Sequence, residues 1–135
     1  MGATNGIFGK IDVSQLNTPP EKHEFETAKF FSSQGKNISF IRPSSIPNTP
    51  RPDIVMDGVE WDIKCPEGNS KRTIESNIRN AIMQSHYIII DLRWIKLTES
   101  QCLSQLELQF KTKSAIKKLL VITKRNELLE FIRKS

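Results

Sequence analysis

Residues 52–64 read Pro-Asp-Ile-Val-Met-Asp-Gly-Val-Glu-Trp-Asp-Ile-Lys, and this stretch decides the fold. Asp57-Gly58 stands between two runs of β-forming residues, which is the strongest short-range signal for a hairpin with a two-residue turn. Counted outward from that turn, Asp53 falls opposite Asp62. Two carboxylates directly across a pair of strands repel each other unless a cation lies between them. The stretch therefore predicts a hairpin that carries a functional site.

The second strand of this hairpin has one polar face and one apolar face. Side chains alternate along a strand, so Glu60, Asp62 and Lys64 share the polar face, and Glu60 lies nearest the turn, outside the predicted site. A solvated face with a single ion pair is the ordinary alternative. The apolar opposite face indicates an interior strand, where uncompensated charges are costly. A cation site beside Lys64 fits the strand better.

The composition describes one basic domain. The chain has 135 residues, with 20 basic and 15 acidic side chains and a formal net charge of +5. This charge favours a polyanionic partner such as a nucleic acid. Cys65 and Cys102 match neither a disulfide framework nor a zinc motif and are predicted to be free thiols. We expect no membrane span, because no stretch has the roughly 20 apolar residues that one requires.

Outside the hairpin, helical and strand patterns alternate. Residues 1–20 predict a linker with at most a short docked piece, and residues 21–135 predict one folded domain. Helices are expected at residues 21–34, about 70–85 with Asn69 or Ser70 as the cap, and 98–111; further strands are expected at 38–41, 87–92, 118–123 and 128–132, the last with a short helix as the alternative. This order indicates an α/β fold with a mixed β-sheet flanked by helices.

A third carboxylate comes from the first expected helix. Glu24 falls on the same side of that helix as Phe25 and Phe31, so it faces the core edge. It is either a partner of the helix dipole, a role for which Glu21 is better placed, or a site ligand aimed at the sheet. Carboxylate oxygens hold hard divalent cations and an ammonium group stabilises developing negative charge, so three acids and a lysine suit phosphodiester hydrolysis.

Glu24, Pro52-Asp53 and Asp62-x-Lys64 together resemble the signature of the PD-(D/E)XK nucleases, and the order of elements resembles their αβββαβ core. The resemblance implies that Asp53 and Asp62 bind Mg²⁺ or Mn²⁺, with Zn²⁺ as an alternative. It also implies that Glu24 is an auxiliary acid and that Lys64 is the catalytic lysine.

Other residues extend the candidate site. Gln84 is similar to a helical glutamine that completes the site in some branches of that family, with simple capping of the helix end as the alternative. Lys71 and Arg72 begin the helix after the catalytic strand and are candidate phosphate contacts. His23 and His86 allow a different interpretation, general acid and base catalysis by an RNase without metal.

Four segments also resemble the C-terminal toxin domains of contact-dependent growth inhibition and related polymorphic toxins. They are residues 23–28, 52–53, 60–64 and 84–91. The resemblance implies an RNase toxin that cleaves transfer RNA in the cytoplasm of a target cell, that is secreted or delivered from a cell surface within a larger protein, and that is held by a cognate immunity protein. A cationic active face predicts an acidic immunity protein. A DNase with the same site and a non-catalytic basic nucleic-acid-binding module remain alternatives.

Overall fold

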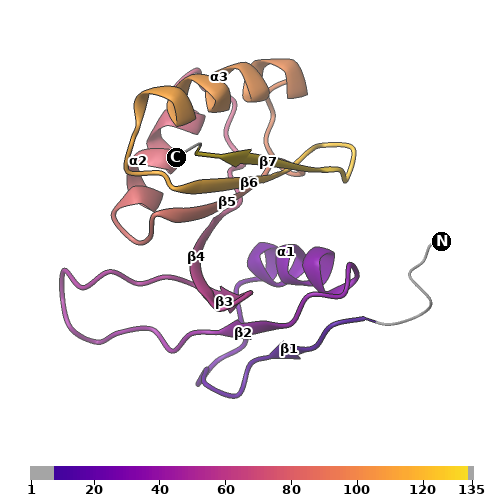
Figure 1. The fold of residues 1–135 in the computed structure, drawn as a ribbon, viewed down its shortest axis with the longest axis vertical. Coiled ribbons are helices and arrows are strands. Elements are labelled where there is room, and N and C mark those ends of the chain that lie inside the picture. The colour runs from indigo at the N-terminus through magenta and orange to yellow at the C-terminus, as the bar shows by residue number, and fades with distance from the viewer. Residues whose placement is uncertain (1–7, 134–135) are drawn as a thin grey trace.

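A computed structural model describes residues 8–133 of the chain. Its helices are α1 (Lys22–Ser32), α2 (Thr73–Ile82) and α3 (Glu99–Thr112), and its strands are β1 (Ile11–Asp12), β2 (Ile38–Phe40), β3 (Ile54–Met56), β4 (Val59–Lys64), β5 (Tyr87–Asp91), β6 (Lys118–Ile122) and β7 (Leu128–Ile132). These strands form one sheet in the order β1-β2-β3-β4-β5-β6-β7, with α1 on one face and α2 and α3 on the other (Figure 1). The expected α/β fold with a mixed, helix-flanked sheet is confirmed. None of the described helices has the length and apolar character needed to cross a membrane.

Strand β4 joins the two halves of the sheet. It pairs antiparallel with β3 on one side and parallel with β5 on the other, so it belongs both to the hairpin and to the parallel part of the sheet. In Figure 1 it runs between the lower half, with β1 to β3 and α1, and the upper half, with β5 to β7, α2 and α3. Residues of β4 can therefore contact side chains from both halves of the sheet.

The hairpin has the predicted register. It runs from Met56 opposite Val59, through Val55 opposite Glu60, to Ile54 opposite Trp61. At the turn, Asp57 has a φ of 56° and Gly58 a φ of 74°, so both residues adopt the left-handed conformation that a type I′ turn requires. Local turn chemistry thus fixes which side chains of the two strands face each other.

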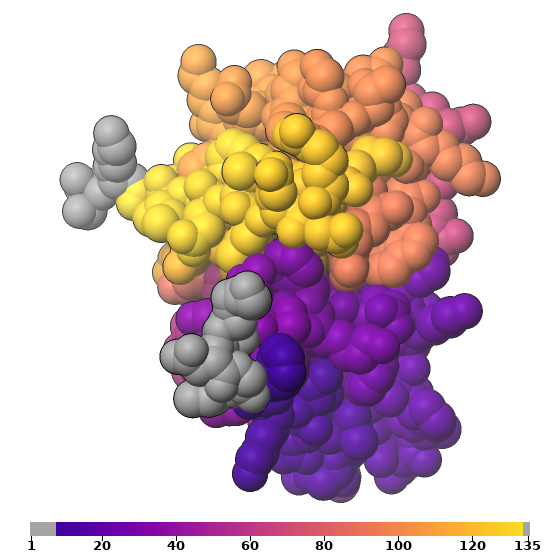
Figure 2. All heavy atoms as spheres, turned by 90° about the vertical axis from the view of Figure 1, so that its right-hand side faces the viewer, coloured from indigo at the N-terminus to yellow at the C-terminus, as the bar shows by residue number. Residues whose placement is uncertain are grey.

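Two apolar cores lie on opposite faces of the sheet. Ile88, Ile89 and Ile90 of β5 are all fully buried, as their continuous apolar run predicts. Ile88 and Ile90 contribute to the core beneath α2 and α3, whereas Ile89 contributes to the core beneath α1. Residues from β6 also join the α1 core, and Figure 2 shows the C-terminal strands (yellow) packed directly on the N-terminal part of the chain (indigo to purple). The two halves therefore stabilise each other.

Part of the predicted linker belongs to the sheet. Strand β1 pairs in parallel with β2. The amide of Gly9 donates to the Ser32 carbonyl at 2.8 Å, and a Cβ at Gly9 would lie 1.6 Å from the Lys36 carbonyl oxygen, so only glycine fits this approach. The short docked piece is thus present at β1, while residues 1–7 of the predicted linker lie outside the described residues.

The start of α2 differs from the prediction, and the structure of residues 128–132 decides between the two predicted alternatives. The cap predicted for α2 is wrong, because Arg72 is its N-cap and makes no side-chain capping bond. Ser70 instead closes a turn before the helix, with its carbonyl accepting from the Thr73 amide at 3.1 Å. Residues 128–132 form a strand rather than a short helix, because they pair along their whole length with β6.

Gly58→Ala is expected to lower the free energy of unfolding by about 1–2 kcal/mol, because a residue with a Cβ is strained at positive φ. Asp57→Asn is the control, since asparagine tolerates this conformation. It loses only an exposed ion pair with Lys36 at 2.8 Å, worth at most about 1 kcal/mol. Urea unfolding measures both variants, and an unchanged midpoint for Gly58→Ala would contradict this account of the turn.

Candidate active site

The two predicted aspartates lie together just beyond the last paired residues of the hairpin. The Asp53 amide donates to the Trp61 carbonyl at 2.8 Å, and Asp53 Oδ2 accepts from the Ile63 amide at 2.7 Å. Asp62, between these two residues of β4, is only 2% exposed. The backbone bonds hold the Asp53 carboxylate against β4 at the level of Asp62.

Lys64 lies two residues after Asp62 on β4, and its side chain extends toward the Asp62 carboxylate. Its Nζ lies 3.1 Å from Asp62 Oδ2, as expected for two residues on one face of a strand. This ion pair lacks the alignment of a hydrogen bond, and Asp62 Oδ2 has no hydrogen-bond partner among the described residues. A buried carboxylate oxygen with an unused lone pair is costly unless another group binds it.

Glu24 completes the acidic cluster from α1. The Glu21 side chain caps this helix by accepting from the amides of His23 and Glu24, at 3.0 and 3.3 Å, so Glu21 serves the helix end. The Glu24 side chain is left to line a hollow of about 210 Å³ together with Asp53. The structure thus brings Glu24, Asp53, Asp62 and Lys64 to one place.

Burial makes these acids hard to ionise. Desolvation, followed by the charge of Asp53, raises the pKa of Asp62 to about 8, and Lys64 only partly opposes this effect. Desolvation also raises the pKa of Asp53, against a hydrogen bond from the Ile63 amide. Burial and then the charge of Asp53 raise the pKa of Glu24 to about 7. The cluster carries less negative charge at neutral pH than three ordinary carboxylates and has a strong affinity for positive charge.

The donor set fits a hard divalent cation. Asp62 Oδ2 is buried without a hydrogen-bond partner, and the neighbouring Asp53 supplies a second carboxylate. Among residues 8–133, no group of three or more His, Cys, Asp or Glu side chains is arranged as a metal cage. Asp53 and Asp62 could therefore hold an ion that keeps several waters or substrate oxygens, which is the habit of Mg²⁺.

Three other predicted site residues form no hydrogen bond with the carboxylates within the described residues. The Gln84 side chain is already engaged, because its Oε1 accepts from the Arg51 amide at 2.8 Å, and within the described part of the chain no contact joins it to the acids. Lys71 and Arg72 are exposed just before α2, where phosphate could reach them. The role expected for each of these three residues stays a prediction.

The two histidines have structural partners. The ring of His23 stacks on Trp94 with centroids 4.0 Å apart, and its Nε2 lies 3.3 Å from Glu67 Oε2. The Nδ1 of His86 lies 2.8 Å from the Ala115 carbonyl oxygen. They come from distant elements and have separate partners, so the geometry favours the carboxylates over a histidine pair as the chemical centre.

The sequence reasoning missed a buried ionic clamp between α1 and β5. Asp91 is fully buried, and its Oδ2 accepts from Thr27 Oγ1 at 2.6 Å and from Arg93 at 2.8 Å. Arg93 also donates to the Glu26 carbonyl at 3.1 Å. Thr27 lies one turn after Glu24 on α1, so the clamp fixes the helix that carries Glu24. The sequence signal that could have predicted this clamp is Asp91 itself, an acid at the end of the apolar run of residues 87–91.

Asp91→Ala is expected to lower the free energy of unfolding by about 3–5 kcal/mol, because it leaves Arg93 without its buried partner. Arg125→Ala is the control: its side chain is 73% exposed and its ion pair with Glu99 is worth at most about 1 kcal/mol. Guanidinium unfolding compares the two. Equal losses would contradict the clamp.

In EDTA, the free energy of unfolding should fall as pH rises from about 4 to about 8. The unfolded chain releases the Asp62 proton near the ordinary pKa of 3.8, whereas the folded protein keeps it until about 8, so the folded state binds more protons between these values. Asp62→Asn stays neutral and should flatten the decline. Thermal unfolding across this pH range measures the difference, and parallel profiles would show that Asp62 ionises normally.

Comparisons with known proteins place the chain in a family. Residues 50–128 match the model of the contact-dependent growth inhibition CdiA C-terminal domain, a region that includes Asp53, Asp62 and Lys64. The fold is similar to that of a chain from a CdiA-CT/CdiI toxin and immunity complex of Burkholderia pseudomallei, with a TM-score of 0.68 and 18% identity over 93% of this chain and 100% of that chain. No curated protein matches the sequence. The chain belongs to the family of contact-dependent growth inhibition CdiA C-terminal domains.

Proposed function

We propose that this CdiA C-terminal toxin domain is a metal-dependent endoribonuclease of the PD-(D/E)XK type that cleaves transfer RNA in the cytoplasm of a target cell. One observation carries the proposal: the hairpin holds the carboxylates of Asp53 and Asp62 together, with Lys64 Nζ 3.1 Å from Asp62 Oδ2. The net charge of +5 supports a polyanionic substrate. The family membership supports a toxic activity of this kind.

Each member of the cluster has a role in phosphodiester hydrolysis. Asp53 and Asp62 would hold Mg²⁺ or Mn²⁺, which supplies polarisation of the phosphoryl group and lowers the pKa of water. The Lys64 ammonium stabilises negative charge on the phosphoryl oxygens and orients the attacking water. Glu24, which lines the hollow beside Asp53, would accept the proton of that water. Lys71 and Arg72 hold flanking phosphates.

A toxin of this kind requires a partner that restrains it. The similar chain from Burkholderia pseudomallei comes from a complex of toxin and immunity protein. By analogy, we propose a cognate immunity protein for this domain, acidic because the domain is basic. The domain would reach the target cell as part of a larger delivered protein, as a CdiA C-terminal domain.

Asp62→Ala and Lys64→Ala are each expected to reduce cleavage of transfer RNA by about 100-fold or more, because they remove a cation ligand and the group that stabilises phosphoryl charge. Gel analysis of transfer RNA incubated with Mg²⁺ measures the product. EDTA should abolish it. Glu107→Ala and Lys10→Ala, at exposed positions on α3 and before β1, are the matched controls and should retain activity.

Three outcomes would contradict this function. Full activity in EDTA would point to a metal-independent RNase, and loss of that activity in His23→Ala would identify its catalytic group. Cleavage of plasmid with intact transfer RNA would make the protein a DNase. Full activity of Asp62→Ala, with circular dichroism matching wild type, would remove the carboxylate pair from the mechanism.

A further inference from the structure

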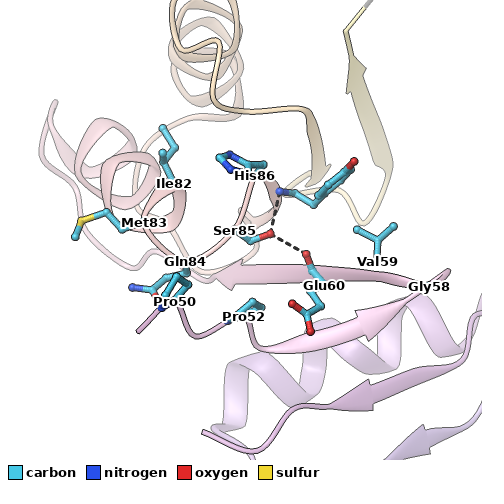
Figure 3. Close-up of a pocket in the computed structure, with 11 residues that line it drawn as sticks. Pro50, Pro52, Gly58, Val59, Glu60, Ile82, Met83, Gln84, Ser85 and His86 are labelled. Carbon is cyan, nitrogen blue, oxygen red and sulfur yellow. Dashed lines mark hydrogen bonds between the residues drawn. The ribbon is translucent and has the colours of Figure 1, made fainter. Parts of the chain in front are cut away.

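Three hollows meet at the C-terminal end of α2, away from the acidic hollow of Glu24 and Asp53. Their volumes are about 520, 450 and 280 Å³, and Met83, 69% exposed, lines all three. We call these three adjoining hollows together the α2 groove. Its main lining residues are Pro50, Arg51, Arg79, Met83, Gln84 and Lys113. Figure 3 shows its largest part, where Met83 projects outward from the helix end and the Glu60 side chain extends from β4 on the side of Pro52.

The groove adjoins the carboxylate pair. Pro52, in its wall, directly precedes Asp53, and Glu60 lies on the same face of β4 as Asp62, two residues earlier. Ser85 Oγ donates to the Glu60 carbonyl at 2.7 Å and accepts from the Tyr87 amide at 3.0 Å, a pair of bonds visible in Figure 3. The end of α2 is thus tied to the strand that carries the site.

A second bond fixes the opposite wall. Gln84 Oε1 accepts from the Arg51 amide at 2.8 Å, two residues before Asp53 in the chain. The proline-rich loop before β3 is thereby attached to the end of α2. The predicted site glutamine thus lies in the groove and holds its walls together, so a ligand would meet a preformed surface.

Two of the three hollows of the groove are cationic, whereas the largest one, which adjoins Pro52, contains Glu60 and no lysine or arginine. Arg51, Arg79 and Lys113 line the groove, and none of the three forms an ion pair within the described part of the chain. Glu60 is the one acid among its described lining residues. The hollow of about 210 Å³ is lined by Glu21, Glu24 and Asp53 and by no lysine or arginine.

We propose that the α2 groove binds the RNA backbone on one side of the phosphodiester held at Asp53 and Asp62, which rests on the proposed function. A strand placed at these carboxylates must leave the site in two directions, and the acidic hollow repels phosphate. The groove offers three cations in its two hollows beyond the one that contains Pro52. An acidic protein would also be attracted, but the groove wall reaches Pro52, the residue before Asp53, which favours the substrate.

The test uses Asp62→Asn protein, in which the proposed function predicts no cleavage, and fluorescence anisotropy with labelled transfer RNA at several salt concentrations. Arg79→Glu and Lys113→Glu, made singly in this background, should each weaken binding by about tenfold and reduce the slope of log K against log salt by about 1 or more. Glu60→Gln should tighten binding. The matched control is Lys10→Glu, an exposed charge reversal before β1 that should change affinity by less than about twofold.

The groove assignment is overturned if Arg79→Glu and Lys113→Glu bind transfer RNA as tightly as Lys10→Glu does. It is also overturned if they keep RNA affinity but lose binding to the purified immunity protein, which would make the groove a protein interface. Failure of the nuclease function is separate. If wild-type protein with Mg²⁺ leaves RNA uncut while the groove variants still lose RNA binding, the groove stands and the nuclease proposal falls.

Discussion

The register of the β3–β4 hairpin is the constraint on which the site depends. Positive φ at Asp57 and Gly58 sets the turn, and the turn sets every pairing outward to Ile54 opposite Trp61. A slip of one residue would move Asp62 to the other face of the strand, into the α1 core. Because β4 is also the antiparallel-to-parallel junction of the sheet, that slip would disrupt both cores as well. Fold and site are therefore specified by the same few residues.

The buried acids divide by how completely they are satisfied. Asp91 has a threonine hydroxyl and an arginine on its oxygens, and it serves to attach α1 to β5. Asp62 is equally inaccessible, yet one oxygen has only a poorly aligned lysine, and its pKa is raised to about 8. A structural acid needs hydrogen-bond partners within the fold for its oxygens, whereas an acid that binds a ligand must keep an oxygen lone pair available for it. This contrast, more than burial, supports the proposed role of Asp62 as a cation ligand.

Local signals predicted more than long-range ones did. The Asp-Gly turn, the apolar run of β5 and the Thr98 cap of α3 are each decided within a few residues, and each was predictable. The pairing of β1 with β2 was not, because two strand residues carry no periodicity and Gly9 shows its role only against the Lys36 carbonyl. The bond of Gln84 to the Arg51 amide, 33 positions away, was likewise not predictable. Carboxylates brought together by a turn are visible in sequence, whereas contacts between distant segments are not.

The charge distribution explains why a cation and RNA would depend on each other at this site. Burial raises the pKa of Glu24 to about 7 and that of Asp62 to about 8, so without a cation the cluster offers phosphate only the charge of Lys64. A divalent cation would add positive charge at this point, whereas the groove cations lie beyond Pro52. RNA can thus be held by the groove before the scissile phosphate enters the acidic centre. In the proposed nuclease, the groove would therefore set affinity and the hairpin carboxylates would set chemistry, two properties carried by different residues.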